Sequence, residues 1–202
     1  MDAYSIGIDL GGTNLRAAAL DQHGKMLGKV SGSTPIGAGP EPVVDDMARA
    51  VEALREQFGR EGLAGIGAGV PGNIDMDKGV IVGWGNMPAF NGYPIRDALA
   101  QRLGTRIVLE NDANAASLGE KWMGAGRTVD DLVMLTLGTG VGGGIIVGGR
   151  ILHGHVGMAG ELGHITVSPN GNPCGCGNRG CLEKHASATA ISAMARLLGL
   201  GH

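Results

Sequence analysis

Three cysteines and a histidine gather near the C-terminal end of the sequence. Cys174, Cys176 and Cys181 are its only cysteines, and His164 precedes the first of them by ten residues. One imidazole and three thiolates form a complete tetrahedral ligand set for Zn²⁺. Cysteines also serve as small core residues, but a Cys-X-Cys pair embedded in glycines does not resemble a core segment. The spacing therefore predicts a zinc site formed by His164, Cys174, Cys176 and Cys181.

Two glutamates flank this ligand set. Glu161 lies three residues before His164, and Glu183 lies two residues after Cys181. A zinc-bound imidazole gives one nitrogen to the metal and presents the other to a partner. If that partner is a substrate hydroxyl, the two carboxylates are natural neighbours, because carboxylates accept hydrogen bonds from paired hydroxyls. The alternative is that both glutamates are solvated surface charges.

Two glycine-rich turns, at residues 11–13 and 138–140, each join two predicted strands. Glycine lets backbone N–H groups converge on an anion, and a carboxylate at a strand end can hold Mg²⁺ through water. A Gly-Gly pair between strands is also simply a good hairpin. Neither turn is a P-loop or a dinucleotide motif, because a strand follows the glycines and no helix does. The candidate phosphate- and Mg²⁺-binding residues are Asp9, Gly11, Gly12, Thr13, Gly138, Thr139 and Gly140.

An acidic and amide-rich stretch, residues 110–114, follows a short apolar strand and opens a predicted helix. One interpretation is an N-cap with an acidic first turn. The other is a general base, Asp112, at the carboxyl end of a strand, where it would accept a hydroxyl proton. The two are compatible, since the helix dipole stabilises the ionised carboxylate.

The composition is that of a globular protein with an aliphatic core. The chain has 202 residues, a formal net charge of −3, 43% hydrophobic and 3% aromatic residues, and 39 glycines. The charge balance argues against a nucleic-acid partner, and no apolar run is long enough to span a membrane. The N-terminus does not resemble a signal peptide. Closely spaced cysteines fit a metal site in a reducing compartment, so we expect a cytoplasmic location.

Strand and helix periodicities alternate along the chain. The predicted strands are Tyr4–Leu10, Asn14–Leu20, Met26–Ser31, Leu63–Val70, Ile107–Glu110, Leu132–Leu137, Gly143–Val147 and Arg150–Leu152. The predicted helices are Val43–Phe58, Pro94–Leu103, Asp112–Met123 and His185–Leu200. The first three strands should form an antiparallel meander. The strand, glycine turn and strand that open residues 1–118 recur in residues 119–202, which predicts two related lobes.

These motifs follow one another in the order seen in the ROK family, which comprises repressors, open reading frames and sugar kinases. The resemblance covers nearly the whole chain. The stretch Asn86-Met-Pro-Ala-Phe90-Asn-Gly is most similar to the bacterial glucokinase branch. The matching motifs are Asp9-X-Gly11-Gly12-Thr13-X-X-Arg16, Glu110-Asn111-Asp112-Ala113, Gly138-Thr139-Gly140-X-Gly142-Gly143-Gly144, Glu161-X-Gly163-His164 and Cys174-X-Cys176-Gly177-X-X-Gly180-Cys181-X-Glu183.

The resemblance implies an α/β, actin-like (ribonuclease H-like) fold with two lobes and a cleft. It implies ATP and Mg²⁺ at the two glycine turns, a structural Zn²⁺, and Asp112 as the catalytic base that activates the 6-hydroxyl of a hexose. Glucose is the first candidate substrate, and homodimers or homotetramers are common in the family. The implied sugar-binding residues are Gly69, Asn86, Asn111, Asp112, Glu161, His164 and Glu183, with Gly72 as an alternative backbone contact to Gly69.

Other readings stay open. The family's kinases for N-acetylglucosamine, N-acetylmannosamine, mannose and fructose share most of these positions. A second alternative is a non-catalytic sugar-binding or regulatory protein of the same family. Family repressors carry a helix-turn-helix before the first glycine turn, and this sequence starts close to its first strand, which argues against DNA binding. Family kinases continue beyond the point where this sequence stops, so we expect an incomplete second lobe.

Overall fold

The structure is a computed structural model that describes residues 3–84 and 87–200. The chain divides into two compact units, Met1–Ala115 and Ala116–His202. The lobes predicted for residues 1–118 and 119–202 stay a prediction. In the described part of the chain, no helix combines the length and the apolar character needed to cross a membrane.

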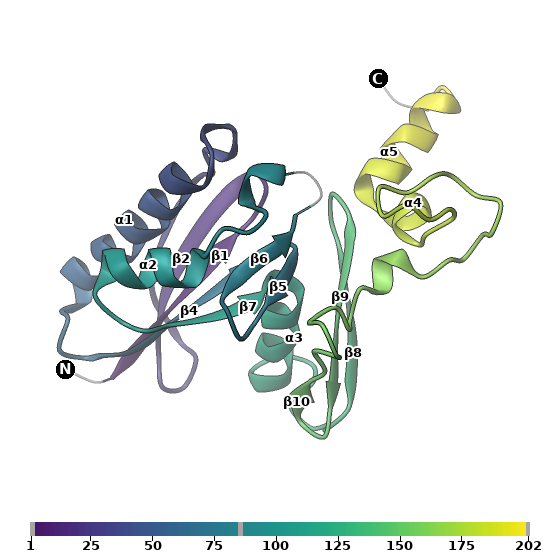
Figure 1. The fold of residues 1–202 in the computed structure, drawn as a ribbon. Helices are drawn as coiled ribbons and strands as arrows, with labels where there is room; N and C mark the ends of the chain where they lie inside the picture. Colours follow the sequence, from purple (N-terminus) through teal and green to yellow (C-terminus); the bar gives the residue numbers. More distant parts are fainter. Residues whose placement is uncertain (1–2, 85–86, 201–202) are drawn as a thin grey trace. The chain divides into compact units, whose positions relative to one another are not determined.

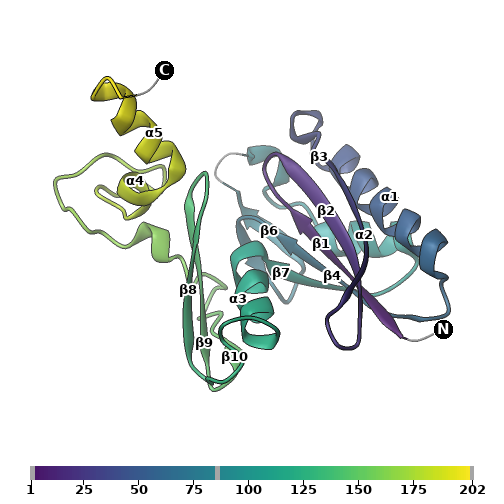
Figure 2. The same cartoon turned by 180° about the vertical axis from the view of Figure 1, so that it is seen from behind.

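The first unit is built on a five-stranded mixed sheet with the order β3-β2-β1-β4-β7 (Figure 1). β1 (Tyr4–Leu10), β2 (Asn14–Asp21) and β3 (Met26–Ser33) form the predicted antiparallel meander, which is confirmed. Figure 2 shows this meander from the opposite side. β4 (Leu63–Val70) runs parallel to β1, and β7 (Ile107–Asn111) runs parallel to β4. Three neighbouring strands therefore have their carboxyl ends at the same edge.

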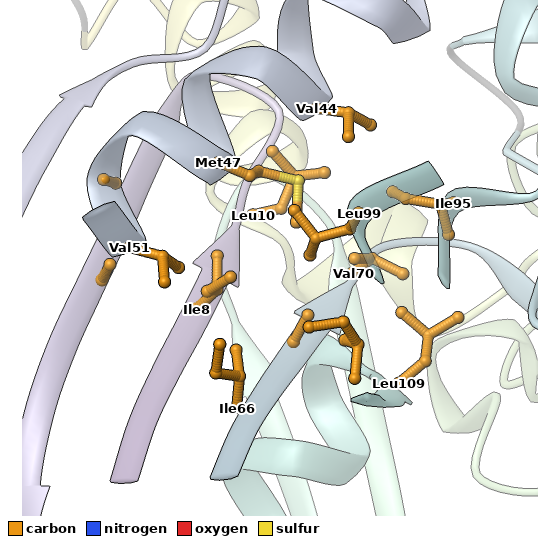
Figure 3. Close-up of a cluster of buried hydrophobic side chains, with 14 of the residues drawn as sticks. Ile8, Leu10, Val44, Met47, Val51, Ile66, Val70, Ile95, Leu99 and Leu109 are labelled. Atoms are coloured by element: carbon orange, nitrogen blue, oxygen red, sulfur yellow. The ribbon is translucent and has the colours of Figure 1, made fainter. Parts of the chain in front are cut away.

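One face of this sheet packs against α1 (Pro40–Phe58) and α2 (Ile95–Leu103) to form the core. Successive side chains of a strand point to opposite faces of the sheet. Every second side chain of β1 is therefore buried in this core. α1 begins three residues before the predicted helix, because Pro40 suits the first helical turn. The aliphatic side chains of the core interdigitate as Figure 3 shows for Ile8, Leu10, Val44, Met47, Val51, Ile66, Val70, Ile95, Leu99 and Leu109.

A small hairpin and several short helical turns were not predicted. β5 (Asn73–Asp75) and β6 (Val80–Gly83) pair antiparallel. The Asp75 carboxylate closes their turn by accepting a hydrogen bond from the Lys78 N–H at 3.0 Å. Strands of three and four residues are too short to give a periodic signal. The 3₁₀ turns η1 (Ile36–Ala38) and η2 (Pro88–Phe90) are equally short.

The second unit repeats the meander on a smaller scale. β8 (Leu132–Leu137), β9 (Val141–Val147) and β10 (Arg150–Ile151) form an antiparallel sheet with the order β10-β9-β8. The order matches β3-β2-β1 of the first unit, as the recurrence of strand, glycine turn and strand led us to expect. α3 (Asp112–Trp122) begins in the first unit and continues into the second.

The last predicted helix is wrong as a single element. The structure has two helices, α4 (Glu183–Ala186) and α5 (Ala188–Leu197), separated by Ser187. Ser187 is extended, with φ −72° and ψ 155°, and its Oγ accepts a hydrogen bond from the Ala190 N–H at 3.1 Å. A serine that caps the following helix cannot continue the preceding one. A 3₁₀ turn, η3 (Leu162–His164), carries the histidine of the predicted zinc site.

Candidate functional site

The carboxyl edge of the parallel strands brings together residues from three distant parts of the chain. In the strand register, Asp9 of β1 lies opposite Gly69 of β4, and Gly69 lies opposite Glu110 of β7. The next residue of β7 is Asn111, which begins the connection to α3. Ligands commonly bind outside the carboxyl ends of such strands. Three predicted site residues, Asp9, Gly69 and Asn111, therefore belong to one edge of the first unit.

Gly69 allows the start of α3 to lie against β4. A Cβ at this position would be 3.3 Å from the Ala115 Cβ and 3.5 Å from the Asp112 Cα. Gly72 has a φ of 90°, and a Cβ there would be 2.5 Å from the Gly83 carbonyl oxygen. Gly72 is thus required by its positive φ and a close backbone approach, whereas a Cβ at Gly69 would need only a small shift of its neighbours.

Asn111 is the N-cap of α3. Its Oδ1 accepts hydrogen bonds from the Ala113 N–H at 2.9 Å and the Asn114 N–H at 3.1 Å, which is the arrangement of a capping side chain. Its Nδ2 donates to the Gly72 carbonyl oxygen at 3.2 Å. The amide therefore fixes the helix start to the segment that follows β4. The N-cap interpretation of this stretch is confirmed, and Asn111 fills that position.

Asp112, the first residue of α3, has a carboxyl group suited to a proton acceptor. Burial raises its pKa above the ordinary value of 3.8, and the negative charge of Asp9 raises it further. A hydrogen bond from the Ala113 N–H to Asp112 Oδ1, at 2.8 Å, opposes this shift. A carboxylate that is destabilised in this way is a stronger base than one in water.

The first glycine turn is closed by hydrogen bonds within its own segment. The Gly11 N–H donates to the Asn14 carbonyl oxygen at 2.8 Å. Thr34, which follows β3, donates two further hydrogen bonds to the turn. Its hydroxyl donates to the Gly11 carbonyl oxygen at 3.1 Å, and its N–H donates to the Thr13 carbonyl oxygen at 3.0 Å. Gly12 and Thr13 are exposed, as a backbone anion site requires. Asp9 and Arg16 form an exposed ion pair at 3.3 Å across the same two strands; such a pair contributes little to stability.

The second glycine turn is attached to the start of α5. The Gly138 N–H donates to the Gly140 carbonyl oxygen at 3.0 Å, which closes the turn. The Ala188 N–H donates to the Gly138 carbonyl oxygen at 2.9 Å, and the Thr189 hydroxyl donates to the Thr139 carbonyl oxygen at 2.8 Å. The helix that follows the cysteine loop therefore holds this turn in place.

Glu183 lies against the same turn. Its Oε2 accepts a hydrogen bond from the Val141 N–H at 3.2 Å. A Cβ at Gly140 would collide with this carboxylate oxygen, so the glycine leaves room for the glutamate. The second turn and the cysteine loop are thus connected through one carboxylate, a contact that sequence spacing did not reveal.

The four predicted zinc ligands come together in the second unit. Their ligand atoms all lie within 4.8 Å of one another. His164 Nδ1 is 3.5 Å from Cys174 Sγ, and Cys176 Sγ is 3.6 Å from Cys181 Sγ. Tetrahedral bonds of about 2.0–2.3 Å to nitrogen and sulfur give ligand–ligand distances of about 3.5–3.8 Å. The donor set and its spacing therefore fit Zn²⁺.

The loop that carries the thiols contains several backbone hydrogen bonds of its own. The Cys174 N–H donates to the Asn178 carbonyl oxygen at 2.8 Å, the Gly177 N–H donates to the Cys174 carbonyl oxygen at 3.1 Å, and the Gly180 N–H donates to the Asn172 carbonyl oxygen at 2.8 Å. Burial raises the pKa of Cys181 to about 12. Binding of a metal to this thiol would release its proton.

His164 directs its two ring nitrogens differently. Nδ1 lies beside Cys174 Sγ, whereas Nε2 is 3.9 Å from Glu161 Oε2. A metal bound through Nδ1 would leave Nε2 for the glutamate or for a ligand. Contacts of His164, Glu161 and Glu183 with a sugar stay predictions. Asn86 lies outside the described residues.

Two residues next to Asp112 were missed by the sequence interpretation. Glu110 and Asn114 hydrogen-bond to each other and to the turn that carries Asp112. Their spacing of four residues is a signal of contact only when both lie on a helix, and Glu110 lies in strand β7. Elsewhere in the first unit, an open cavity of about 390 Å³ borders Met76 and Arg96 and contains no predicted site residue.

Comparisons with known proteins agree with the motif order. The ROK family model matches residues 5–197. A glucokinase from Thermotoga maritima is 47% identical over 186 residues, which is 92% of this chain and 58% of the relative's own length. A xylose repressor from Caldicellulosiruptor bescii is 33% identical, over 96% of this chain and 49% of the relative. The chain thus spans between about half and three fifths of these relatives' lengths.

A solved structure shows the same fold. The ROK family glucokinase from Streptomyces griseus, in complex with glucose and AMPPNP, superposes with a TM-score of 0.85 at 39% identity. The match covers 96% of this chain and 61% of that one. The α/β, actin-like fold expected from the sequence is confirmed by this neighbour. With its motifs, its fold and the family model in agreement, the chain belongs to the ROK family.

Proposed function

We propose that this chain supplies the sugar-accepting part of an ATP-dependent hexose kinase, which transfers the γ-phosphoryl group of ATP to the 6-hydroxyl of glucose. The observation that carries the proposal is Asp112, a half-buried carboxyl group with a raised pKa at the carboxyl edge of the sheet. The similarity to glucokinases, one of them solved with glucose and AMPPNP, supports glucose and ATP as substrates.

In this proposal Asp112 accepts the proton of the 6-hydroxyl while the hydroxyl oxygen attacks the γ-phosphorus. Asp112 Oδ1 is bound by the Ala113 N–H, so Oδ2 is the oxygen assigned to the substrate proton. The exposed Asp9 carboxylate, in register with Gly69, is a suitable outer ligand for Mg²⁺. Mg²⁺ bound with the nucleotide neutralises phosphate charge, which is the main electrostatic requirement of phosphoryl transfer.

The four-ligand set of the second unit has a structural role in the proposal. His164, Cys174, Cys176 and Cys181 would fill all four positions of a tetrahedral Zn²⁺, so no position remains open for substrate. The metal would hold the histidine ring with its second nitrogen available, and Glu161 and Glu183 would accept hydrogen bonds from sugar hydroxyls. A cytoplasmic location and a homodimer or homotetramer complete the proposal on the family resemblance alone.

Two alternatives share this site. One is a kinase for another hexose, such as N-acetylglucosamine, N-acetylmannosamine, mannose or fructose. The other is a sugar-binding regulator, which the similarity to a xylose repressor favours. Calorimetry with a panel of these sugars separates the hexoses from one another. Sugar binding without sugar-dependent release of ADP would favour the regulator.

The substitution Asp112→Asn tests the reaction itself. The amide keeps the size of the side chain and cannot accept the proton, so we expect turnover with glucose and ATP to fall by at least about 10²-fold. Glucose affinity should change by far less. Glu56→Ala, which removes an exposed carboxylate from α1, is the matched control. An equal loss of turnover and glucose affinity in Asp112→Asn would contradict the assignment of Asp112 as the base.

A further inference from the structure

We propose that Glu110 and Asn114 are positioning residues that hold Asp112 in the orientation in which it accepts the substrate proton. The inference rests on the proposed function, because it concerns the same carboxyl group. It assigns a task to two polar side chains that are not part of the hydrophobic core. Their connection to Asp112 can be followed atom by atom.

One carboxylate oxygen links the end of β7 to the first turn of α3. Glu110 Oε1 accepts a hydrogen bond from the Asn111 N–H at 2.9 Å and another from Asn114 Nδ2 at 3.1 Å. Asp112 lies between these two donors in the sequence. Its backbone is therefore fixed on both sides by the same oxygen, and hydrogen bonds to a charged acceptor are stronger than neutral ones.

A second set of bonds fixes the same turn from the opposite direction. The Asn111 side chain caps the Ala113 and Asn114 N–H groups and holds the Gly72 carbonyl oxygen. The first turn of α3 is thus attached to both neighbouring parallel strands, directly to β7 and through Gly72 to the segment after β4. Such double attachment restricts the rotation of Asp112 about the helix start.

Asn114 would be a poor choice if this position served packing alone. The residue is only 3% exposed, and its Oδ1 has no hydrogen-bond partner among residues 3–84 and 87–200. Burying an unsatisfied acceptor costs about 1–3 kcal/mol, which an alanine would avoid. An asparagine is understandable here because its Nδ2 is the donor that Glu110 requires. The free-energy cost of burying Oδ1 is then offset by the hydrogen bond that Nδ2 donates to Glu110.

The main alternative is that Glu110 acts by its charge, as an anion near the N-terminus of α3. The two ideas differ in what Glu110→Gln should do. A glutamine retains a carbonyl oxygen that can accept both N–H groups, but it has no charge. A geometric role therefore predicts that glutamine rescues the site and alanine does not, whereas an electrostatic role predicts similar losses in both.

The kinetic test compares Glu110→Ala, Asn114→Ala and Glu110→Gln, with Glu56→Ala as the control. Since small misplacement of a catalytic group costs up to about 100-fold, we expect kcat to fall by about 10–100-fold in both alanine variants, with KM for glucose changed by less than about threefold. Glu110→Gln should stay within about threefold of the unsubstituted protein in both constants. Unchanged kcat in both alanine variants, or an equal loss in Glu110→Gln and Glu110→Ala, would overturn the proposal.

A second readout needs no turnover. NMR titration of the Asp112 carboxyl carbon gives its pKa in the folded chain, and Asn114→Ala leaves every charge in place. If the turn loosens and water enters, the pKa should move down toward 3.8, the ordinary value. A folded Asn114→Ala variant, checked by circular dichroism, with an unshifted Asp112 pKa would refute the positioning role. Absence of glucose binding by the unsubstituted protein in calorimetry would instead refute the proposed function, which makes this chain the sugar-accepting part of the kinase.

Discussion

Removal of the proposed Zn²⁺ should unfold the cysteine loop and leave the first unit intact. The perturbation is dialysis against a strong chelator, and the expected loss is confined to the segment around residues 164–187. The physical reason is that this segment has almost no core of its own. Between Cys174 and Cys181 the only buried side chains are those of these two cysteines, at 8% and 0% exposure.

The magnitude follows from the opposing terms in the loop. Burying the two cysteine side chains contributes about 2 kcal/mol in total. Ordering the eight residues from Cys174 to Cys181 costs about 8–16 kcal/mol, at 1–2 kcal/mol per residue. Structural Zn²⁺ binding supplies about 10–16 kcal/mol at neutral pH. The metal therefore decides whether the loop is ordered, and the metal-free loop is unfavourable by several kcal/mol.

Amide hydrogen exchange, with zinc content measured in parallel, is the appropriate assay. The reporter amides are those of Cys174, Gly177 and Gly180, each of which donates a hydrogen bond within the loop. They should exchange at rates close to those of an unfolded peptide once zinc is lost, while the β1 and β4 amides keep their protection. Addition of Zn²⁺ should restore the loop amides.

Two substitutions give the matched comparison. His164→Asn removes a ligand and should lower the zinc content, whereas His155→Asn changes an exposed histidine outside the cluster and should not. Retained protection of the three loop amides in chain shown to contain no metal would refute the reasoning. So would equal zinc loss in the two histidine variants.

Three further predictions concern the fold around the site. Gly72→Ala should destabilise the first unit by about 1–3 kcal/mol, because φ is 90° and the added Cβ meets the Gly83 carbonyl oxygen. Gly92→Ala, at φ 79° in open space, should cost less, and urea unfolding of both variants checks this. Ser187→Ala should lower stability by about 1 kcal/mol and reduce helical circular dichroism, since the cap of α5 is lost; an unchanged spectrum and midpoint would contradict the cap. The raised pKa of Asp112 means that the folded chain holds this proton more tightly than the unfolded chain does. The free energy of unfolding should therefore fall as pH rises from 3.8 through the raised pKa. Measured against pH in Asp112→Asn, it should show no such fall.

Much of the first unit could be predicted because its signals are local. The Gly11–Thr13 turn specifies a hairpin, and the alternation in β1 specifies which face is buried. The gathering of His164, Cys174, Cys176 and Cys181 could be predicted for the same reason, because three of them lie within one short loop. In each case residues close in the sequence determine the outcome.

The features that were missed either give no clear periodic signal or depend on contacts between distant segments. The β5–β6 hairpin is too short to show a period, and its stability comes partly from packing of Ile74 and Ile81 in the core of the first unit. The single C-terminal helix was wrong because Ser187 is compatible with a helix interior until the cap it forms is seen. The attachment of Glu183 to the second glycine turn joins residues 42 positions apart, which spacing cannot reveal.

The order of the strands in the five-stranded sheet has a consequence for how the chain acquires its chemistry. The β1–β3 meander needs only neighbouring residues, so it can form early on a chain emerging from the ribosome. β4 joins only after α1 has been made, and β7 pairs with β4 and comes last in the sequence. The residue that follows β7 is Asp112. Completion of the sheet therefore coincides with the arrival of the residue that we propose as the base, and a chain arrested at any earlier stage has a partial sheet without Asp112.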